Sequence, residues 1–126
     1  MSFTNFLETE ILDHVFAGAA YTAPSTKYIG LFTAAPGETG GGTELSGSAY
    51  ARRPVVFATS GATTSNNAAV EWATATGSWG TITHVGVFDA ATSGNLMAYA
   101  ALSASKAIAT GDVFRIPSGD LDITLN

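Results

Sequence analysis

Two histidines, His14 and His84, are the side chains best suited to proton transfer or metal binding near neutral pH. His14 falls at the end of a predicted helix, and His84 falls inside a predicted strand. Neither is followed by a metal-ligating residue two or four positions later. Asp89 lies on the opposite strand face from His84, because successive strand residues face opposite ways. The spacing therefore predicts that His84 is a hydrogen-bonded sheet residue.

The other motifs that could carry chemistry are incomplete. Gly40-Gly41-Gly42 follows a predicted strand, but a phosphate loop needs a lysine at its end, where Thr43-Glu44 stands. Asp112, Asp120 and Asp122 lack the close spacing of a calcium loop. The chain has no Gly-x-Ser-x-Gly motif and no cysteine, which excludes a nucleophile elbow, a thiolate nucleophile and Cys-ligated metals. We expect no catalytic, metal-binding or cofactor-binding residue, and therefore no enzyme.

Three aromatic residues, Tyr50, Trp72 and Trp79, are predicted to lie at strand ends beside polar loops. Their rings could form a platform on which a sugar stacks, or they could fill the ends of a sandwich core. Trp79 stands directly before Gly80, as a core aromatic does at a tight bend, which favours the core interpretation. The sugar platform stays as the alternative.

An amphipathic helix is predicted from about Thr4 to Ala17. Ser2, Thr4 or Asn5 can cap its N-terminus, and Gly18 can end it in the left-handed conformation. The apolar stripe of this helix could cover an open face of the sheet or act as a docking element, and its breadth favours the cover. Its apolar residues recur at steps of three, four and one and predict a single stripe made of Phe3, Phe6, Leu7, Ile11, Leu12, Val15 and Phe16.

After Ser25 the apolar period changes from near 3.6 to two, which predicts short strands separated by turn residues. We predict a mainly β fold, an antiparallel β-sandwich of about seven strands over residues 27–126, in a single domain of 126 residues. Two long polar loops, residues 34–48 and 60–67, interrupt the strand spacing. The predicted strands are Tyr28–Thr33, Pro54–Ala58, Ala69–Ala73, Thr81–Asp89, Leu96–Leu102, Val113–Ile116 and Leu121–Leu125.

The chain is acidic and poor in charge. Five Lys+Arg against ten Asp+Glu give a net charge of -5, so no basic face is expected for nucleic acid or an anionic membrane. The first residues carry acids where a signal peptide has basic residues, and no apolar run is long enough for a membrane span. Only 12% of the residues are charged and 14 are glycine, which indicates a surface that packs against other protein.

Several ordered blocks extend from the predicted helix to the last strand: Leu12-Asp13-His14-Val15-Phe16, Leu31-Phe32-Thr33-Ala34-Ala35-Pro36, Gly40-Gly41-Gly42-Thr43-Glu44-Leu45-Ser46-Gly47, Tyr50-Ala51-Arg52, Trp79-Gly80-Thr81-Ile82-Thr83-His84, Phe88-Asp89-Ala90-Ala91 and Gly119-Asp120-Leu121-Asp122. Together they resemble a family of short tailed-bacteriophage virion proteins that are commonly labelled tail fibre proteins. The resemblance implies a component of the phage particle and carries over no catalytic residue.

We therefore predict a non-enzymatic bacteriophage virion structural protein that assembles as a homo-oligomer, with a trimer favoured. It is expected to attach to phage capsid or tail proteins, as a capsid decoration or cement protein or as a small tail or collar fibre protein. The alternative is a receptor-recognition module of the tail that binds host-surface glycan through Tyr50, Trp72 and Trp79. We expect no cofactor, no nucleic acid and no membrane insertion, and a location in the virion after assembly in the bacterial host cytoplasm.

Overall fold

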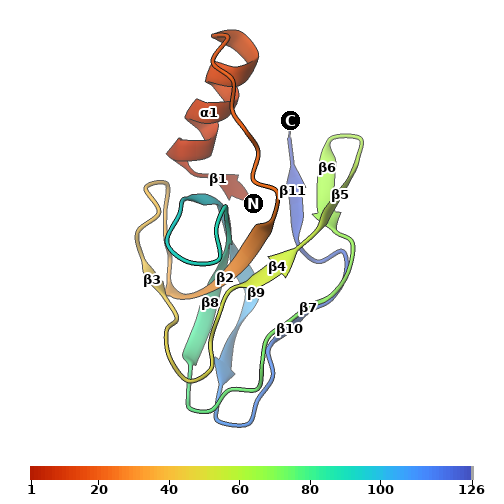
Figure 1. The fold of residues 1–126 in the computed structure, drawn as a ribbon. Helices are drawn as coiled ribbons and strands as arrows, with labels where there is room; N and C mark the ends of the chain where they lie inside the picture. The colour runs from red at the N-terminus through yellow and green to blue at the C-terminus, as the bar shows by residue number, and fades with distance from the viewer. Residues whose placement is uncertain (126) are drawn as a thin grey trace.

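The computed structural model describes residues 1–125, which form one helix and antiparallel sheets (Figure 1). The centre of the largest sheet consists of β2 (Lys27–Ala34), β8 (Gly80–Phe88) and β9 (Leu96–Ile108). Three short strands complete it, namely β1 (Ser2–Phe3), β3 (Thr43–Glu44) and β4 (Arg53–Val55). The strand order is β1-β9-β8-β2-β3, and β4 also pairs with β2.

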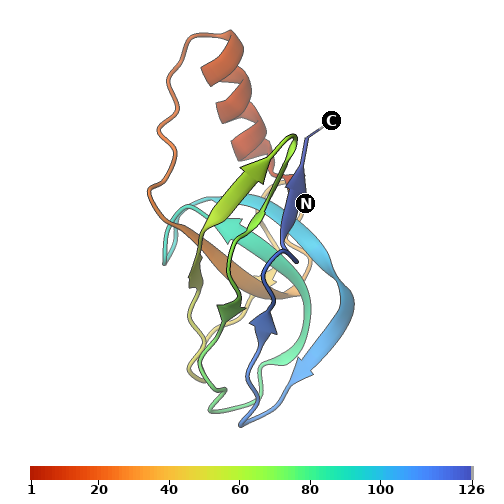
Figure 2. The same ribbon diagram turned by 90° about the vertical axis from the view of Figure 1, so that its right-hand side faces the viewer.

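Two smaller sheets form the second layer. One pairs β7 (Val70–Glu71) with β10 (Arg115–Ile116). The other contains β5 (Phe57–Ser60), β6 (Thr63–Asn66) and β11 (Asp122–Thr124), with β6 in the middle. Figure 2 shows these short strands in front of the curved main sheet. The β5–β6 hairpin and the end of β11 extend past the main sheet at the same end as helix α1 (Asn5–Phe16).

The core lies between the two layers and follows from alternation along the central strands. Ile29 and Leu31 of β2 pair with Val87 and Val85 of β8, and all four side chains are buried. The second layer adds Val70, Trp72, Phe114, Ile116 and Leu121 to the same cluster. Burial of this apolar surface is the main force that holds the layers together. The predicted β-sandwich with an N-terminal helix is confirmed.

The outer face of the main sheet has a small core of its own, built around two paired glycines, Gly30 and Gly86. A Cβ on Gly86 would lie 2.5 Å from Leu96 Cδ1, and a Cβ on Gly30 would lie 2.7 Å from Phe88 Cε2. The bare backbone leaves room for Phe32 and Phe88, whose rings stack with 5.9 Å between centroids. Both faces of the sheet are therefore packed.

The structure has more strands than the sequence predicted, with eleven in residues 1–125. The predicted strand Pro54–Ala58 is divided between β4 and β5, which pair in different sheets. The predicted polar loop at 60–67 is wrong, because most of it forms the β5–β6 hairpin. There, the Thr59 and Thr64 hydroxyls lie 3.0 Å apart across the strands. Threonine favours strands even when it is exposed, because it is β-branched and pairs across the ladder.

Strand β9 continues to Ile108, whereas the sequence predicted its end at Leu102. Ile82 pairs with Lys106 and His84 pairs with Ala101, so residues 102–105 bulge opposite the single residue Thr83. The bulge contains Ser103-Ala104-Ser105, whose small side chains show no apolar alternation. The sequence therefore had no signal for this part of the strand.

The variant Gly86→Ala is expected to lower the free energy of unfolding by about 1–3 kcal/mol, because the added methyl group overlaps Leu96 and Phe32. The matched control is Gly41→Ala, whose Cβ would lie 3.5 Å from the Pro36 carbonyl oxygen, an ordinary contact. This control should stay within about 0.5 kcal/mol of the wild type. Urea denaturation measures both variants, and equal midpoints would contradict the close packing at Gly86.

Candidate functional site

Helix α1 is fixed at its base and projects from the body of the molecule (Figure 1). Thr4 stands at the N-cap position, as the sequence allowed, but its buried hydroxyl donates to the Leu96 carbonyl at 2.6 Å and caps no helix N–H. Its backbone N–H donates to the Met97 carbonyl at 2.9 Å. Asn5 N–H donates to the Glu38 carbonyl at 3.0 Å. The start of the helix is therefore attached to β9 and to the loop that carries Glu38.

One face of α1, which we call the inner face, is covered by the chain that follows the helix. The helix ends at Phe16, and Gly18 takes a left-handed φ of 74°, which is the stop that the sequence predicted. The chain then turns back, and Tyr21 N–H donates to His14 Nδ1 at 3.0 Å. The Tyr21 ring meets the Phe6 ring edge-on, with 6.4 Å between centroids. Phe6 and Leu7 are half-buried on this face.

The opposite face of α1, which we call the outer face, is apolar and exposed. Leu12, Val15 and Phe16 are 57%, 59% and 82% exposed. At 3.6 residues per turn these three lie within about 100° of arc, and Phe16 stands about 180° from Leu7. The single stripe of the sequence analysis is only partly covered: Leu7, Ile11 and Val15 follow one another at about 40° around the helix, and the stripe continues to the exposed Leu12 and Phe16. Phe3, which the sequence placed in the stripe, belongs to β1. The favoured interpretation as a cover does not apply to the outer face, and no residue of α1 is fully buried.

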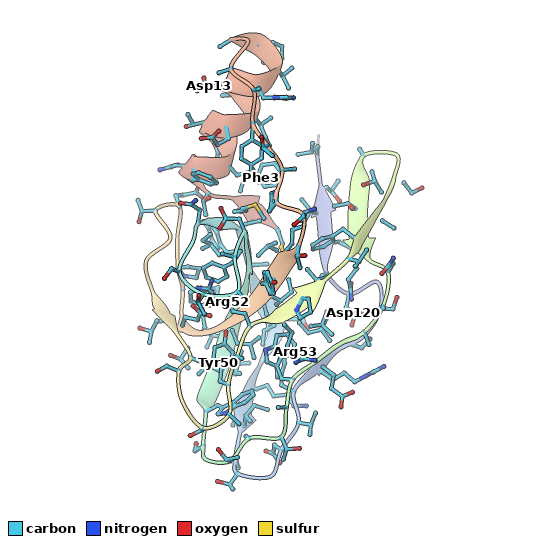
Figure 3. All side chains as sticks on the ribbon, viewed as in Figure 1. Phe3, Asp13, Tyr50, Arg52, Arg53 and Asp120 are labelled. Carbon is cyan, nitrogen blue, oxygen red and sulfur yellow. The ribbon has the colours of Figure 1, made fainter. Side chains whose placement is uncertain are left out.

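Two acidic residues stand beside the outer face. By the same helical geometry, Glu8 lies one turn before Leu12 and Asp13 lies at its edge. Asp13 is on the projecting part of the helix, away from the sheets (Figure 3). The outer face is thus a convex apolar surface with a negative border. It suits a partner with an apolar concavity and a cation at its rim.

An ion pair between Arg52 and Glu44 fixes the loop of residues 34–48, which we call the glycine-rich loop. The guanidinium binds both carboxylate oxygens, with Nη2 to Oε1 at 2.8 Å and Nε to Oε2 at 2.9 Å. Arg52 Nη1 also donates to the Ala90 and Ser93 carbonyls, at 2.9 and 2.7 Å. The Arg52 guanidinium carbon lies 3.4 Å from the centroid of the Phe88 ring. One side chain therefore joins β3, the turn after β8 and the outer face of the sheet.

Tyr50 extends this network into the main sheet (Figure 3). Its hydroxyl donates to Glu44 Oε2 at 2.7 Å and accepts the Leu31 N–H at 3.0 Å. Burial, and then the hydrogen bond to Glu44, raise the pKa of Tyr50 above its ordinary value of 10.0. The Tyr50 ring meets Trp79 edge-on with 5.7 Å between centroids. Tyr50 is therefore a structural hydrogen-bonding residue in this arrangement.

The two tryptophans proposed for sugar stacking are core residues. Trp72 and Trp79 are 2% and 5% exposed. Trp72 packs edge-on against Phe114, and Trp79 Nε1 donates to the Ser48 carbonyl at 2.9 Å. With Tyr50 half-buried beside Trp79, the structure offers none of these rings as an open platform for a sugar. The core interpretation from the sequence describes these residues correctly.

The remaining polar candidates are not brought together. His84 lies in β8 with its Nδ1 2.8 Å from the Thr83 hydroxyl, so the prediction of a hydrogen-bonded sheet histidine is confirmed. Asp112 accepts the Ala109 N–H at 2.9 Å, and Asp122 accepts the Ser65 hydroxyl. Among residues 1–125, no three His, Cys, Asp or Glu side chains are grouped as a metal site would require.

No helix in the described part of the chain is long and apolar enough to cross a membrane.

The comparison with protein families decides the affiliation of the chain. The family model described as podophage GP4 fiber I protein gp80 matches residues 2–124. The match covers the helix, both layers of the sandwich and the network around Arg52. The protein belongs to this fiber protein family. A search of the curated proteins gives no match.

Membership in the fiber protein family confirms the resemblance to phage tail fibre-like proteins that the sequence blocks indicated. The family is one of phage fiber proteins, so this chain is a phage fiber or virion structural protein and a component of the phage particle. The outer face of α1 carries three of the six exposed large apolar residues in the described part of this fiber protein.

The sequence analysis gave no role to Glu44 and Arg52, although both fall in blocks that carry the family resemblance. A signal was present in the charge distribution. In a chain with 12% charged residues, Glu44 ends a glycine-rich stretch and two adjacent arginines, Arg52 and Arg53, begin eight positions later. Opposite charges so close together can fix a loop, because a buried arginine needs a carboxylate partner.

The raised pKa of Tyr50 predicts that the fiber protein loses stability above about pH 10. The unfolded chain releases the Tyr50 proton near its ordinary pKa, whereas the folded chain holds the proton to a higher pH. Unfolding therefore releases a proton, and the free energy of unfolding falls by up to about 1.4 kcal/mol per pH unit from this residue.

The variant Tyr50→Phe lacks this proton, so its stability should fall less steeply between about pH 9 and pH 11. Urea denaturation across this pH range measures both slopes, and the other three tyrosines are common to both proteins. Parallel slopes for the wild type and the variant would contradict the buried hydrogen bond between Tyr50 and Glu44.

Proposed function

We propose that this fiber protein is a non-enzymatic part of the phage particle that attaches to other particle proteins through the outer face of α1. The exposure of Leu12, Val15 and Phe16 carries this proposal. Covering one such side chain yields about 1.5–3 kcal/mol. The base of the helix is tied to β9, so the outer face is held in a defined position before a partner arrives, which lowers the entropic cost of docking.

The two ends of the molecule differ in a way that supports attachment through the end that carries α1. Helix α1, the β5–β6 hairpin and the end of β11 gather at one end (Figure 2). Leu125, next to β11, is 58% exposed and adds to the apolar surface of that end. The connections β7–β8 and β9–β10 lie at the opposite end (Figure 1), and Val113 is their exposed large apolar residue. In this proposal the α1 end faces the particle.

The composition supports assembly from several copies. A surface with few charges has little electrostatic repulsion to overcome when identical copies approach, even though each carries a net charge of -5. We propose a homo-oligomer, with a trimer favoured, that assembles in the bacterial host cytoplasm and needs no cofactor, metal, nucleic acid or membrane insertion. The acidic balance of the sequence argues against nucleic acid and an anionic membrane as partners, and the absence of cysteine argues against a Cys-ligated metal.

Two locations agree with this role. A capsid decoration or cement protein would be present in on the order of hundreds of copies, and a tail or collar fibre in a few tens at most. The fiber family favours the tail or collar. Receptor recognition through Tyr50, Trp72 and Trp79 is less favoured, because two of these rings are buried.

The double variant Leu12→Ser/Phe16→Ser is expected to fold normally and to be missing from particles. Its midpoint of thermal unfolding should match the wild type, because both side chains are already mostly exposed. Its copy number on purified virions should fall about tenfold or more, because an interface would lose the burial of two large apolar side chains. Quantitative mass spectrometry measures this copy number on virions grown with the variant as the sole source of the protein.

The matched control is Val56→Ser, which removes an apolar side chain that is 65% exposed on the body of the protein. It should fold and should enter particles at the wild-type copy number. Wild-type incorporation of the Leu12→Ser/Phe16→Ser protein would contradict attachment through the outer face of α1.

A further inference from the structure

His14 stands in the last turn of α1 and holds the chain that leaves the helix. We call residues 17–26, which lead from the helix to β2, the returning segment. The Tyr21 N–H donates to His14 Nδ1 at 3.0 Å. A ring nitrogen accepts a hydrogen bond only when it carries no proton, so this contact requires the neutral imidazole with its proton on Nε2. The contact therefore exists in only one protonation state of His14.

Few other contacts hold the returning segment. Within residues 1–125, Tyr21 makes both of the hydrogen bonds that attach residues 20–26 to the rest of the protein. Its N–H donates to His14, and its hydroxyl lies 3.7 Å from Met97 Sδ, which is a weak acceptor. The Tyr21 ring also meets Phe6 edge-on. The segment has no charged side chain, and only Tyr21 and Pro24 in it are partly buried.

The charged groups around His14 favour its protonated form. Glu10 precedes His14 by one helical turn, so the two side chains lie on the same side of α1. Asp13 is the preceding residue, and the C-terminus of a helix attracts a cation in its last turn. Burial, and then the carboxylates of Asp89 and Glu10, raise the pKa of Tyr21, so its hydroxyl stays neutral in mild acid. A protonated His14 thus has negative groups beside it in place of Tyr21.

We propose that His14 and Tyr21 form an acid-sensitive switch, in which neutral His14 holds the returning segment against α1 and protonated His14 releases it. After protonation Nδ1 carries a hydrogen, and two N–H donors face each other where the hydrogen bond was. Phe6 then loses the ring that covers its edge. The base of the helix stays in place, because Thr4 is bonded to β9 without His14. The switch lies away from the outer face of α1, so it does not rest on the proposed function.

Release of the segment takes up a proton, so acid favours release. The held state needs the neutral ring, whereas the released state accepts either form. A solvated imidazole takes up its proton at about pH 6.5. Between about pH 7.5 and pH 5, the ratio of released to held segment therefore rises by up to about 30-fold. Above about pH 7.5 the segment stays held, and pH has little further effect.

Solvent exchange of the Tyr21 amide proton, measured by NMR on the whole protein in solution, tests the switch. The protection factor is the exchange rate of an unstructured peptide at the same pH divided by the measured rate. For the wild type it should fall by up to about 30-fold from about pH 7.5 to pH 5. The Thr4 amide, which donates to the Met97 carbonyl at 2.9 Å, should keep its protection and so report that the fold is intact.

The matched control is His14→Asn, because the asparagine side-chain oxygen replaces Nδ1 as an acceptor and does not titrate. Protection of Tyr21 in this variant should change by less than about threefold over the same range. The variant His14→Ala has no acceptor and should leave Tyr21 unprotected at both pH values. The proposal is overturned by a constant protection factor in the wild type, by an equal loss in His14→Asn, or by wild-type protection in His14→Ala. None of these results depends on whether Leu12→Ser/Phe16→Ser enters virions.

Discussion

The ion pair between Arg52 and Glu44 is the contact on which the arrangement of the glycine-rich loop depends. Ordering a long glycine-rich loop costs conformational entropy, and a charge-poor chain has few polar contacts with which to offset that cost. The fixed loop also carries Glu38, whose carbonyl accepts Asn5 N–H and whose carboxylate accepts the Tyr99 hydroxyl at 2.6 Å. Thr4 attaches the start of helix α1 to β9 directly, and the fixed loop adds the contact between Asn5 and Glu38.

Helix α1 has one covered side and one exposed side. The inner face, with Phe6 and Leu7, holds the helix against β9 and the returning chain around Tyr21. The outer face, with Leu12 and Phe16, is exposed, and in our proposal it contacts another particle protein. A helix that is fixed on one side and apolar on the other presents its free side without a conformational change, which suits a component that must be incorporated many times in the same way.

Local patterns in the sequence predicted the features that depend on apolar periodicity and on the backbone preferences of neighbouring residues. The period change after Ser25 identified the β-sandwich, Gly18 identified the end of the helix, and Trp79 before a glycine identified a core aromatic. The features that were missed depend on distant partners. The covering of Phe6 follows from the returning chain around Tyr21, and the pairing of β9 beyond Leu102 follows from its contacts with β8. Neither leaves a periodic pattern in the sequence.

The measurement that tests the account most directly is a high-resolution image reconstruction of the phage particle that carries this fiber protein. The account predicts that the α1 end points toward the particle and that protein density covers Leu12, Val15 and Phe16. A reconstruction in which α1 projects into solvent, with the β7–β8 and β9–β10 connections toward the particle, would contradict it.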